Sequence, residues 1–552
     1  MKIIRSVAFL GILWSMLVGL GGGMNQAVAQ NADIQEQLRQ RLWAFRDTVQ
    51  TPLVANEKEQ LRSLAAVQQF YEQRGYRPAW ILGLYIPPNT KEMVQAIQQA
   101  DDNGLVPEEY HYSAIQQLIN TFNAETTAVT DLVDLDLLLT DAYLLLSQHY
   151  AKGKVDPKSI GIAWHLTKKM FNPVIYLNRT LDSNTSPASS LNKLLPQNPA
   201  YDALRKALKA YRQTNDWDSS IPYNWSTMVQ RGYRDPLVPS IRSVLTATGD
   251  LTTTESLDAS IYDRAVETAV MSFQRRHGLH YDGITRGTTI TAMNVSRQER
   301  VNQLIANLER WRWMPDNLGS SFVIVNVPEF NLYVFDKGEL KYKEAVIVGR
   351  EAYQTPSFSD SLQYIIFNPL WYLPKSIAKN ELLPELEYDK NLFINRDIRV
   401  FKNGQRIDPQ KVDWAKANAD DYTFAQAASA YNPMGVVKFM FPNPHDIYIH
   451  DTPTRELFDN SRRSYSHGCV RVKDPVKFAS FLLEGDATWD STRIKKVLFS
   501  QKQTQVNLPR PIPIHLLYWT AFVDMENNEL NFREDLYRWD EKLTKAILEY
   551  KK

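Results

Sequence analysis

Apolar residues recur at helical spacing over the first third of the chain. Between residues 61 and 70 they fall near a 3.6-residue period, and residues 132–150 (LVDLDLLLTDAYLLLSQHY) are apolar on most sides. A helix that is apolar around most of its circumference belongs inside a bundle. Residues 30–236 are therefore predicted to form a mainly helical scaffold domain, with breaks where Gly and Pro gather near residues 75–88 and 103–107.

Residues 237–294 carry two more apolar helical faces and a glycine-rich tail. One face contains Ile241, Val244 and Leu245, and the second runs from residue 265 to residue 273. The tail FQRRHGLHYDGITRG places its glycines at helix-ending and turn positions. Through the pattern FQxxxGLxxDGxxxG this stretch resembles the peptidoglycan-binding domain of many cell-wall enzymes. An ordinary small helical domain is the alternative.

The period changes from helix to strand after a helix near residues 300–313. Strand-like runs at residues 322–327 and 332–335 are followed by a DKG turn, and others continue to residues 446–450. We expect a linker helix within residues 295–319, a β-rich domain over residues 320–500, and a C-terminal extension over residues 501–552. The domain is interrupted by a mixed insertion at residues 379–433, and such insertions are often lids. The predicted fold class is α+β multidomain.

The first thirty residues read as an export signal. Lys2 and Arg5 precede an apolar run over residues 7–20, and Ala27 and Ala29 form a cleavage pattern of small residues. The run is shorter than the roughly 20 residues that a membrane-spanning helix needs. Residues 1–29 are therefore predicted to be a cleaved signal peptide, which places the protein in the periplasm or cell envelope. An uncleaved membrane anchor is the alternative.

The net charge narrows the kinds of binding partner, and the cysteine count singles out one side chain. The chain has 63 basic and 62 acidic residues, a net charge of +1, which argues against nucleic acid as a partner. Exported proteins usually carry cysteines in pairs as disulfides, whereas Cys469 is the one cysteine here. The simplest alternative is a buried cysteine that acts as a small apolar residue.

The neighbours of Cys469 favour a nucleophile. The segment SHGCVR, residues 466–471, places His467 and Arg471 within two residues of the thiol. A nearby cation or imidazolium favours the thiolate, which is the reactive form. Gly468 leaves room for a carbonyl substrate, and successive backbone N–H groups could form an oxyanion hole.

A second histidine lies 19 residues upstream of Cys469, at the end of the run DIYIH. Strand alternation places the two isoleucines on one face and Tyr448 and His450 on the other. We expect that second face to be open, so that His450 can act as the base toward the thiol.

These residues resemble the L,D-transpeptidase family, whose pattern is a His, a gap of under twenty residues, and SHGC with a downstream Arg. The matching segments are IYIHDTP at residues 447–453 and YSHGCVRV at residues 465–472. The large multidomain form of the family is matched by GYRPAW at 75–80, NGLVP at 103–107, NPLWYLP at 368–374, GVVKF at 435–439 and YWTA at 518–521.

The resemblance implies a role for each site residue. Cys469 is the nucleophile and His450 its base, while His467 and Arg471 orient the loop and stabilise charge. Ser466 positions the loop through a hydrogen bond. Tyr448 and Trp371 match positions near the substrate cleft, although an aromatic side chain there is as often part of the core.

The implied reaction is acyl transfer on peptidoglycan stems. The thiol attacks the amide between diaminopimelate and the terminal D-Ala of a tetrapeptide, D-Ala leaves, and an amine takes the acyl group from the thioester. A stem amine as acceptor gives a 3-3 crosslink, while a lipoprotein or a free D-amino acid stays open. Peptidoglycan is then donor and acceptor, other wall synthases are candidate partners, carbapenems are expected to inhibit covalently, and no cofactor or metal is implied.

Three other functional classes are alternatives to an acyltransferase. A zinc amidase needs clustered ligands, and the nine histidines include no HExxH spacing. A cysteine carboxypeptidase or endopeptidase would pass the thioester to water instead of an amine. A non-catalytic wall-binding scaffold would leave the thiol without a reaction.

Overall fold

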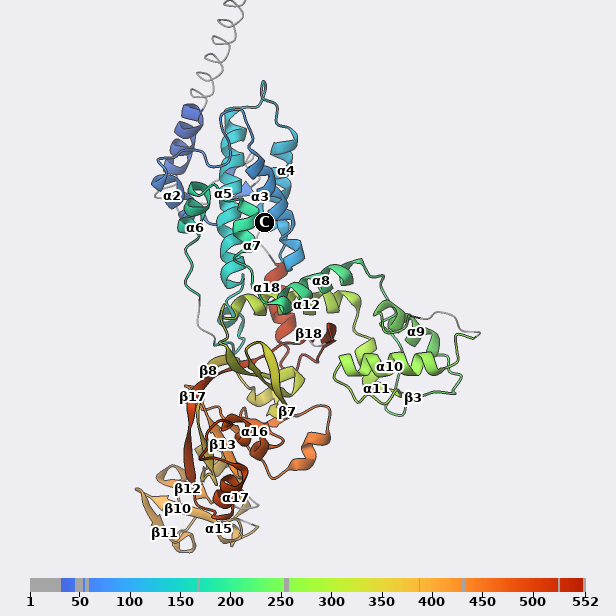
Figure 1. Ribbon diagram of the computed structural model, residues 1–552, viewed down its shortest axis with the longest axis vertical. Helices are drawn as coiled ribbons and strands as arrows, with labels where there is room; N and C mark the ends of the chain where they lie inside the picture. The colour runs from blue at the N-terminus through green and yellow to red at the C-terminus, as the bar shows by residue number, and fades with distance from the viewer. Residues whose placement is uncertain are drawn as a thin grey trace, which may run out of the picture.

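The computed structural model of the chain describes residues 31–44, 53–54, 59–165, 169–252, 258–386, 388–427, 432–524 and 527–549. A helical lobe, a small helical lobe at its side and a β-rich lobe meet near the middle of the molecule (Figure 1). The predicted α+β multidomain class is confirmed. The expected signal peptide lies outside the described residues. Among the helices that the structure describes, none is long and apolar enough to cross a membrane.

The scaffold is a helical bundle around one buried helix, α5 (Val129–Lys152). Its residues are buried on nearly every side, as the sequence predicted for residues 132–150. Several surrounding helices begin with a polar cap followed by proline, for example Asn172 before Pro173 and Asn198 before Pro199, which fixes where each helix starts. The other scaffold helices lie at residues 31–44 and at α2 (Leu64–Gln73), α3 (Pro88–Gln98), α4 (Tyr112–Asn120), α6 (Pro173–Asp182), α7 (Pro187–Asn192) and α8 (Pro199–Gln213).

The small helical lobe has a core of its own. Helices α9 (Val238–Ala247), α10 (Arg264–Arg276) and α11 (Gly287–Met293) bury the two predicted faces, and β3 (Met228–Val229) pairs with β4 (Thr285–Arg286). Trp217, Ile221 and Val229 belong to the same core. The lobe therefore begins about twenty residues before the predicted boundary at residue 237.

Helix α12 (Arg297–Trp313) lies at the centre of the molecule and within the predicted linker helix of residues 295–319. A capping box between Ser296 and Glu299 starts it, and almost every residue from Arg300 onward is buried. It packs against α5 and α8 of the scaffold and against β18 (Ala521–Asp524) and α18 (Trp539–Leu548) near the C-terminus. Helix α12 thereby joins the scaffold to the β-rich lobe.

The β-rich lobe contains a nine-stranded sheet in the order β15-β7-β16-β14-β13-β8-β17-β5-β6. Because β6 also pairs with β7, the strands from β7 to β6 close into a ring. The pairs β14/β16, β15/β7 and β17/β5 are parallel, and the others are antiparallel. The strands are β5 (Ser321–Asn326), β6 (Asn331–Asp336), β7 (Glu339–Gly349), β8 (Phe358–Phe367), β13 (Val437–Met440), β14 (Ile449–His450), β15 (Ser464–Ser466), β16 (Val470–Val472) and β17 (Thr504–Leu517), with α16 (Pro475–Leu482) and α17 (Ser491–Phe499) after β16.

Strand β17 lies between β8 and β5, inside the sheet. The sheet of the β-rich lobe therefore continues past residue 500 and takes an interior strand from the predicted C-terminal extension. The hairpin of β18 and β19 (Glu529–Phe532) and helix α18 then return the chain to α12.

The insertion is a small domain with a sheet in the order β11-β10-β12-β9. It begins at β9 (Trp371–Tyr372), earlier than the predicted residue 379, because β9 pairs with β12 (Tyr422–Gln426). Its own core includes Leu392, Val400 and Phe424. The other elements are α13 (Lys375–Ile377), a π-helical turn at Ala378–Leu382, α14 (Leu383–Glu385), α15 (Leu392–Asn395), β10 (Ile398–Lys402) and β11 (Gln405–Ile407).

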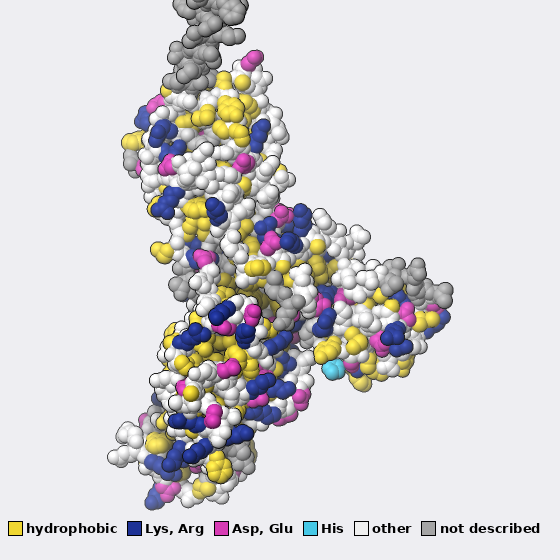
Figure 2. Space-filling view, in the orientation of Figure 1, with side chains coloured by type: hydrophobic (Ala, Val, Ile, Leu, Met, Phe, Trp, Pro, Cys, Tyr) yellow, Lys and Arg dark blue, Asp and Glu magenta, His cyan; other side chains and the backbone are white. Residues whose placement is uncertain are grey.

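Charges of both signs are interspersed on the surface. Figure 2 shows Lys and Arg beside Asp and Glu on all three lobes of the visible face, in keeping with a net charge of +1. The visible surface therefore resembles that of an ordinary globular protein and not that of a polyanion-binding protein.

A buried ion pair at the end of α12 generates the first prediction. Glu309 Oε2 and Arg312 Nη2 lie 2.6 Å apart with neither side chain exposed, and Arg312 also donates to the Asn103 carbonyl oxygen at 2.8 Å. Arg312→Ala leaves a buried carboxylate without its cation, so the free energy of unfolding should fall by about 3–5 kcal/mol. Urea unfolding measures it.

The matched control is Lys206→Ala, which breaks an exposed pair with Asp202 on α8. That loss should stay within about 0.5 kcal/mol. Equal effects of the two substitutions would contradict a central role for the buried pair.

Candidate active site

Three neighbouring strands bring the predicted chemistry together. In the sheet, β14 lies between β13 and β16, so that His450 is opposite Lys438 on one side and Arg471 on the other. The Val470 N–H donates to the Tyr448 carbonyl oxygen at 3.1 Å, which holds the nucleophile segment against the histidine segment. Residues 19 apart in sequence are therefore neighbours across one strand pair.

The turn before β16 has a defined shape. Ser466 Oγ donates to the Cys469 carbonyl oxygen at 2.5 Å and accepts the Gly468 N–H at 3.1 Å. Thr355 Oγ1 donates to the Gly468 carbonyl oxygen at 2.7 Å, and Gly468 has φ +110°, which side-chain-bearing residues rarely adopt. Glycine is thus required by the backbone conformation, whereas a Cβ at this position would make only ordinary contacts, the nearest at 3.4 Å from Ile447 Cδ1. The Gly468 N–H is already bonded to Ser466, so it does not contribute to an oxyanion hole, and the Cys469 N–H is the amide next to the thiol.

The thiol of Cys469 is held in a partly buried position. Its Sγ lies 3.7 Å from the Asp446 carbonyl oxygen, to which the S–H donates. Burial raises the pKa of Cys469, while the backbone N–H and hydroxyl of Tyr448 and the cations Lys438 and Arg471 act in the opposite direction. Burial dominates, so the resting group at neutral pH is the thiol.

His450 is buried, not on an open face as expected. Only 3% of its surface is exposed, because strands lie on both sides of β14. Its Nδ1 is 2.5 Å from the Asp451 carbonyl oxygen, which can only accept, so Nδ1 carries the proton and Nε2 presents a lone pair. Burial, followed by the charge of Arg471, lowers the pKa of His450 to about 3. The imidazole is therefore neutral at physiological pH.

Lys438 is a site residue that the sequence pattern alone did not indicate. Its Nζ lies 3.6 Å from the centroid of the Tyr448 ring, and that ring is 5.6 Å from the His450 ring. Burial lowers the pKa of Lys438, and the charge of Cys469 acts against this. One signal was available, because Lys438 is the only charged residue in the apolar strand VKFM.

His467 lies on the outer side of the nucleophile turn. Its Nε2 is 3.0 Å from Arg350 Nη2 and 3.6 Å from Glu381 Oε1, and its ring is 4.7 Å from that of Tyr353. Glu381 belongs to the insertion, so the insertion reaches the active-site turn. Burial, then Arg350, lowers the pKa of His467. Arg350 and Glu381 were also missed.

Arg471 lies near the thiol, whereas Trp371 lies in the insertion domain. Arg471 is largely buried, with Nη1 3.5 Å from Thr454 Oγ1, and its charge acts on Cys469. Trp371 begins β9 and packs against the insertion core, so it belongs to the insertion domain. Among the described residues, no group of three or more His, Cys, Asp or Glu side chains could hold a metal ion.

Comparison with known proteins assigns the three lobes. Residues 320–497 match the model of the L,D-transpeptidase catalytic domain, residues 65–208 that of a scaffold domain, and residues 234–293 that of a "Putative peptidoglycan binding domain". A "Putative L,D-transpeptidase" of Haemophilus influenzae is 33% identical over 258 residues, which are 46% of this chain. The aligned part spans 52% of that relative, about half its length.

Solved structures of two L,D-transpeptidases also align. That from Xylanimonas cellulosilytica is 14% identical, covering 54% of this chain and 100% of that one, with a TM-score of 0.17. That from Stackebrandtia nassauensis is 12% identical, covering 52% and 94%, with a TM-score of 0.21. Scores this low carry no structural argument, so the assignment depends on the domain models and the curated relative. The chain therefore carries an L,D-transpeptidase catalytic domain beside a scaffold domain and a peptidoglycan-binding domain.

Proposed function

We propose that this protein is an exported acyltransferase that forms 3-3 crosslinks between peptidoglycan tetrapeptide stems. The observation that carries the proposal is the position of the one cysteine of the chain, beside Tyr448 and the cations Lys438 and Arg471, immediately before strand β16, which pairs with the strand that carries the neutral His450. A thiol, a proton acceptor and positive charge are what acyl transfer through a thioester needs.

In the first half-reaction the sulfur attacks the carbonyl carbon between diaminopimelate and the terminal D-Ala. In the resting enzyme the thiol does not give its proton to the imidazole, because burial raises the pKa of Cys469 and lowers the pKa of His450. The proton therefore moves to His450 Nε2 as the C–S bond forms, when the sulfur becomes more acidic. The imidazolium returns it to the leaving nitrogen as the C–N bond breaks, and D-Ala departs.

In the second half-reaction an amine of another stem attacks the thioester. Its nitrogen loses a proton to His450, the C–S bond breaks, and the thiol is restored with a new amide. In both halves the negative oxygen needs donors, and the Cys469 N–H beside Lys438 and Arg471 provides an amide and positive charge near it. Water in place of the amine would give a tripeptide, which is the carboxypeptidase alternative.

Export and wall binding complete the proposal. The basic and apolar start of the chain directs it to the periplasm or cell envelope, where peptidoglycan is available. The domain matched over residues 234–293 would keep the enzyme on that polymer. Other wall synthases are proposed as partners, and carbapenems as covalent inhibitors whose strained amide mimics the donor.

Replacing the nucleophile tests the proposal directly. Cys469→Ala should retain the fold and release no D-Ala from a purified disaccharide tetrapeptide, because no other thiol exists in the chain. Mass spectrometry of wild-type products should show D-Ala release and a crosslinked dimer. Turnover by Cys469→Ala would refute the thioester, and tripeptide alone from the wild type would favour the carboxypeptidase.

The pH dependence of carbapenem acylation tests the role of His450. Because the pKa of the Cys469 thiol is raised and that of His450 is about 3, the thiol and the neutral imidazole that react are both the resting forms, so the wild-type rate should be nearly independent of pH between pH 6 and pH 8. His450→Ala should lower the rate near pH 7 by about 10²- to 10⁴-fold and make the remaining rate rise with pH, because only the thiolate can then attack. Intact-mass spectrometry follows the adduct.

His467→Ala is the matched control. His467 is partly exposed and held by Arg350 and Glu381, so its loss should change the rate by less than about tenfold. A larger loss of acylation rate in His467→Ala than in His450→Ala would show that His467, and not His450, is the base.

A further inference from the structure

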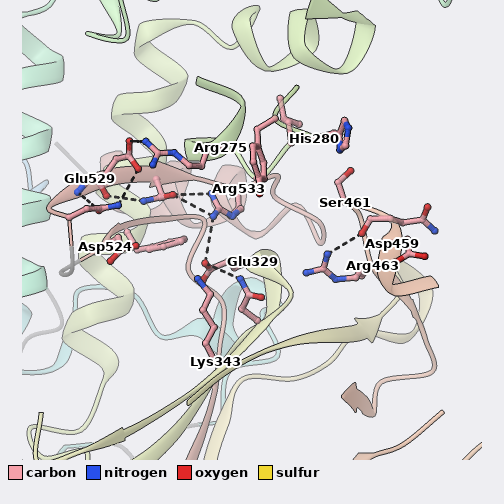
Figure 3. A pocket seen from close by; sticks show the side chains of 18 residues that line it. Arg275, His280, Glu329, Lys343, Asp459, Ser461, Arg463, Asp524, Glu529 and Arg533 are labelled. Atoms are coloured by element: carbon pink, nitrogen blue, oxygen red, sulfur yellow. Dashed lines mark hydrogen bonds and ion pairs between the residues drawn. The ribbon is translucent and has the colours of Figure 1, made fainter. Parts of the chain in front are cut away.

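A cavity of about 640 Å³ lies where the peptidoglycan-binding domain faces the catalytic sheet, apart from the nucleophile turn (Figure 3). Four segments line it: the end of α10 with the following turn, the strands around Glu329 and Lys343, residues 459–463 before β15, and the β18–β19 hairpin. None of the residues assigned to acyl transfer lines it.

The walls of this interdomain cavity are fixed by contacts between the domains. Arg275 of α10 pairs with Glu529 of β19 at 2.6 Å, and Arg533 Nη1 donates to the Arg276 carbonyl oxygen at 2.7 Å. Gly278 packs so closely that a Cβ on it would lie 2.8 Å from Arg533 Cδ. The cavity is therefore present before any ligand arrives.

The lining has a mixed, strongly polar chemistry. It contains four Lys or Arg side chains, four carboxylates and four asparagines, together with the aromatic rings of Tyr281 and Phe522. Tyr281 is 63% exposed, which leaves its ring free to stack. Such a lining suits neither a lipid nor a polyanion. It suits a ligand with hydroxyl and amide groups that also carries carboxylate and ammonium charges.

Two charges in the cavity are open to such a ligand. Lys343 Nζ lies over the Tyr333 ring, 5.1 Å from its centroid, and the Asp459 side chain is exposed. Within the described part of the chain, neither residue has an ion-pair partner. Arg463, in contrast, donates to the carbonyl oxygens of Val346 and Phe330 and so holds the wall in place. Figure 3 shows Lys343 and Asp459 on different walls.

The cavity is close to the nucleophile along the chain. Arg463, which lines the cavity, is followed directly by β15, and Cys469 is six positions further along the chain. At about 3.3 Å per residue the two positions are at most ~20 Å apart. A polymer lying in the cavity could therefore present one of its side branches to the thiol.

We propose that the interdomain cavity binds the saccharide chain of peptidoglycan together with a charged stem, as a second binding site for the polymer on which Cys469 acts. This inference rests on the proposed function. Lys343 pairs with a stem carboxylate, Asp459 with a stem ammonium group, and Tyr281 stacks on a sugar ring.

Calorimetric titration of the full chain tests it, in a Cys469→Ala background that prevents turnover. The two probes are a soluble tetrasaccharide bearing two tetrapeptide stems and the free tetrapeptide. Lys343→Ala/Asp459→Ala removes the two charges that hold the stem and should weaken binding of the tetrasaccharide by roughly three- to tenfold. Tyr281→Ala removes the ring that stacks on a sugar and should weaken binding of the tetrasaccharide while leaving binding of the tetrapeptide unaffected. The control Lys341→Ala/Glu456→Ala removes one exposed cation and one exposed carboxylate from the same segments, outside the cavity.

The control should bind both probes as the parent does. Unchanged tetrasaccharide binding in the cavity variants, or an equal loss in the control, would overturn the inference. The proposed function fails by a different result, the absence of D-Ala release from the tetrapeptide by the wild type, which does not involve the cavity.

Discussion

The architecture depends on the buried ion pair between Glu309 and Arg312. Glu309 accepts the Val155 N–H at 2.8 Å, and Arg312 donates to the Tyr201 hydroxyl at 3.1 Å, so one pair ties α12 to two separate parts of the scaffold. Two residues before Glu309, Asn307 Nδ2 donates to Thr520 Oγ1 at 2.7 Å, which ties the same helix to the C-terminal segment. Buried charges and amides of this kind tolerate few alternative arrangements. The orientation of the scaffold toward the catalytic sheet follows from them.

Burial also sets the chemistry of the active site. Cys469 and His450 are both driven toward their neutral forms, while Lys438 and Arg471 are placed to favour the thiolate. An enzyme arranged in this way keeps its sulfur unreactive until a carbonyl group is in position. The proposed export gives this restraint a further value, because a permanently ionised thiol in an oxidising compartment would be open to modification.

Local features were predictable from sequence, whereas features that depend on strand pairing were not. The buried faces of α5 and α10 and the segment around Cys469 follow from periodicity and residue type. Lys438 is brought to His450 only by the register of β13 with β14, 12 residues away in sequence. Strand alternation correctly predicted that His450 lies on the same face as Tyr448, but alternation does not show which residues cover that face. For the same reason the sequence could not show that β17 lies inside the sheet or that α12 is buried among three parts of the molecule.

The attachment of the insertion has an evolutionary consequence. Strand β8 enters it and β13 leaves it, and these two strands pair directly, with Phe367 opposite Val437 and the Asn368 N–H bonded to the Val436 carbonyl oxygen at 2.9 Å. Its two ends are therefore neighbours, and the closing hairpin would survive a change in what lies between them. Length and sequence can drift there at a small cost in loop entropy. The insertion can thus diverge among descendants of one ancestral gene while the register that places His450 opposite Arg471 is inherited unchanged.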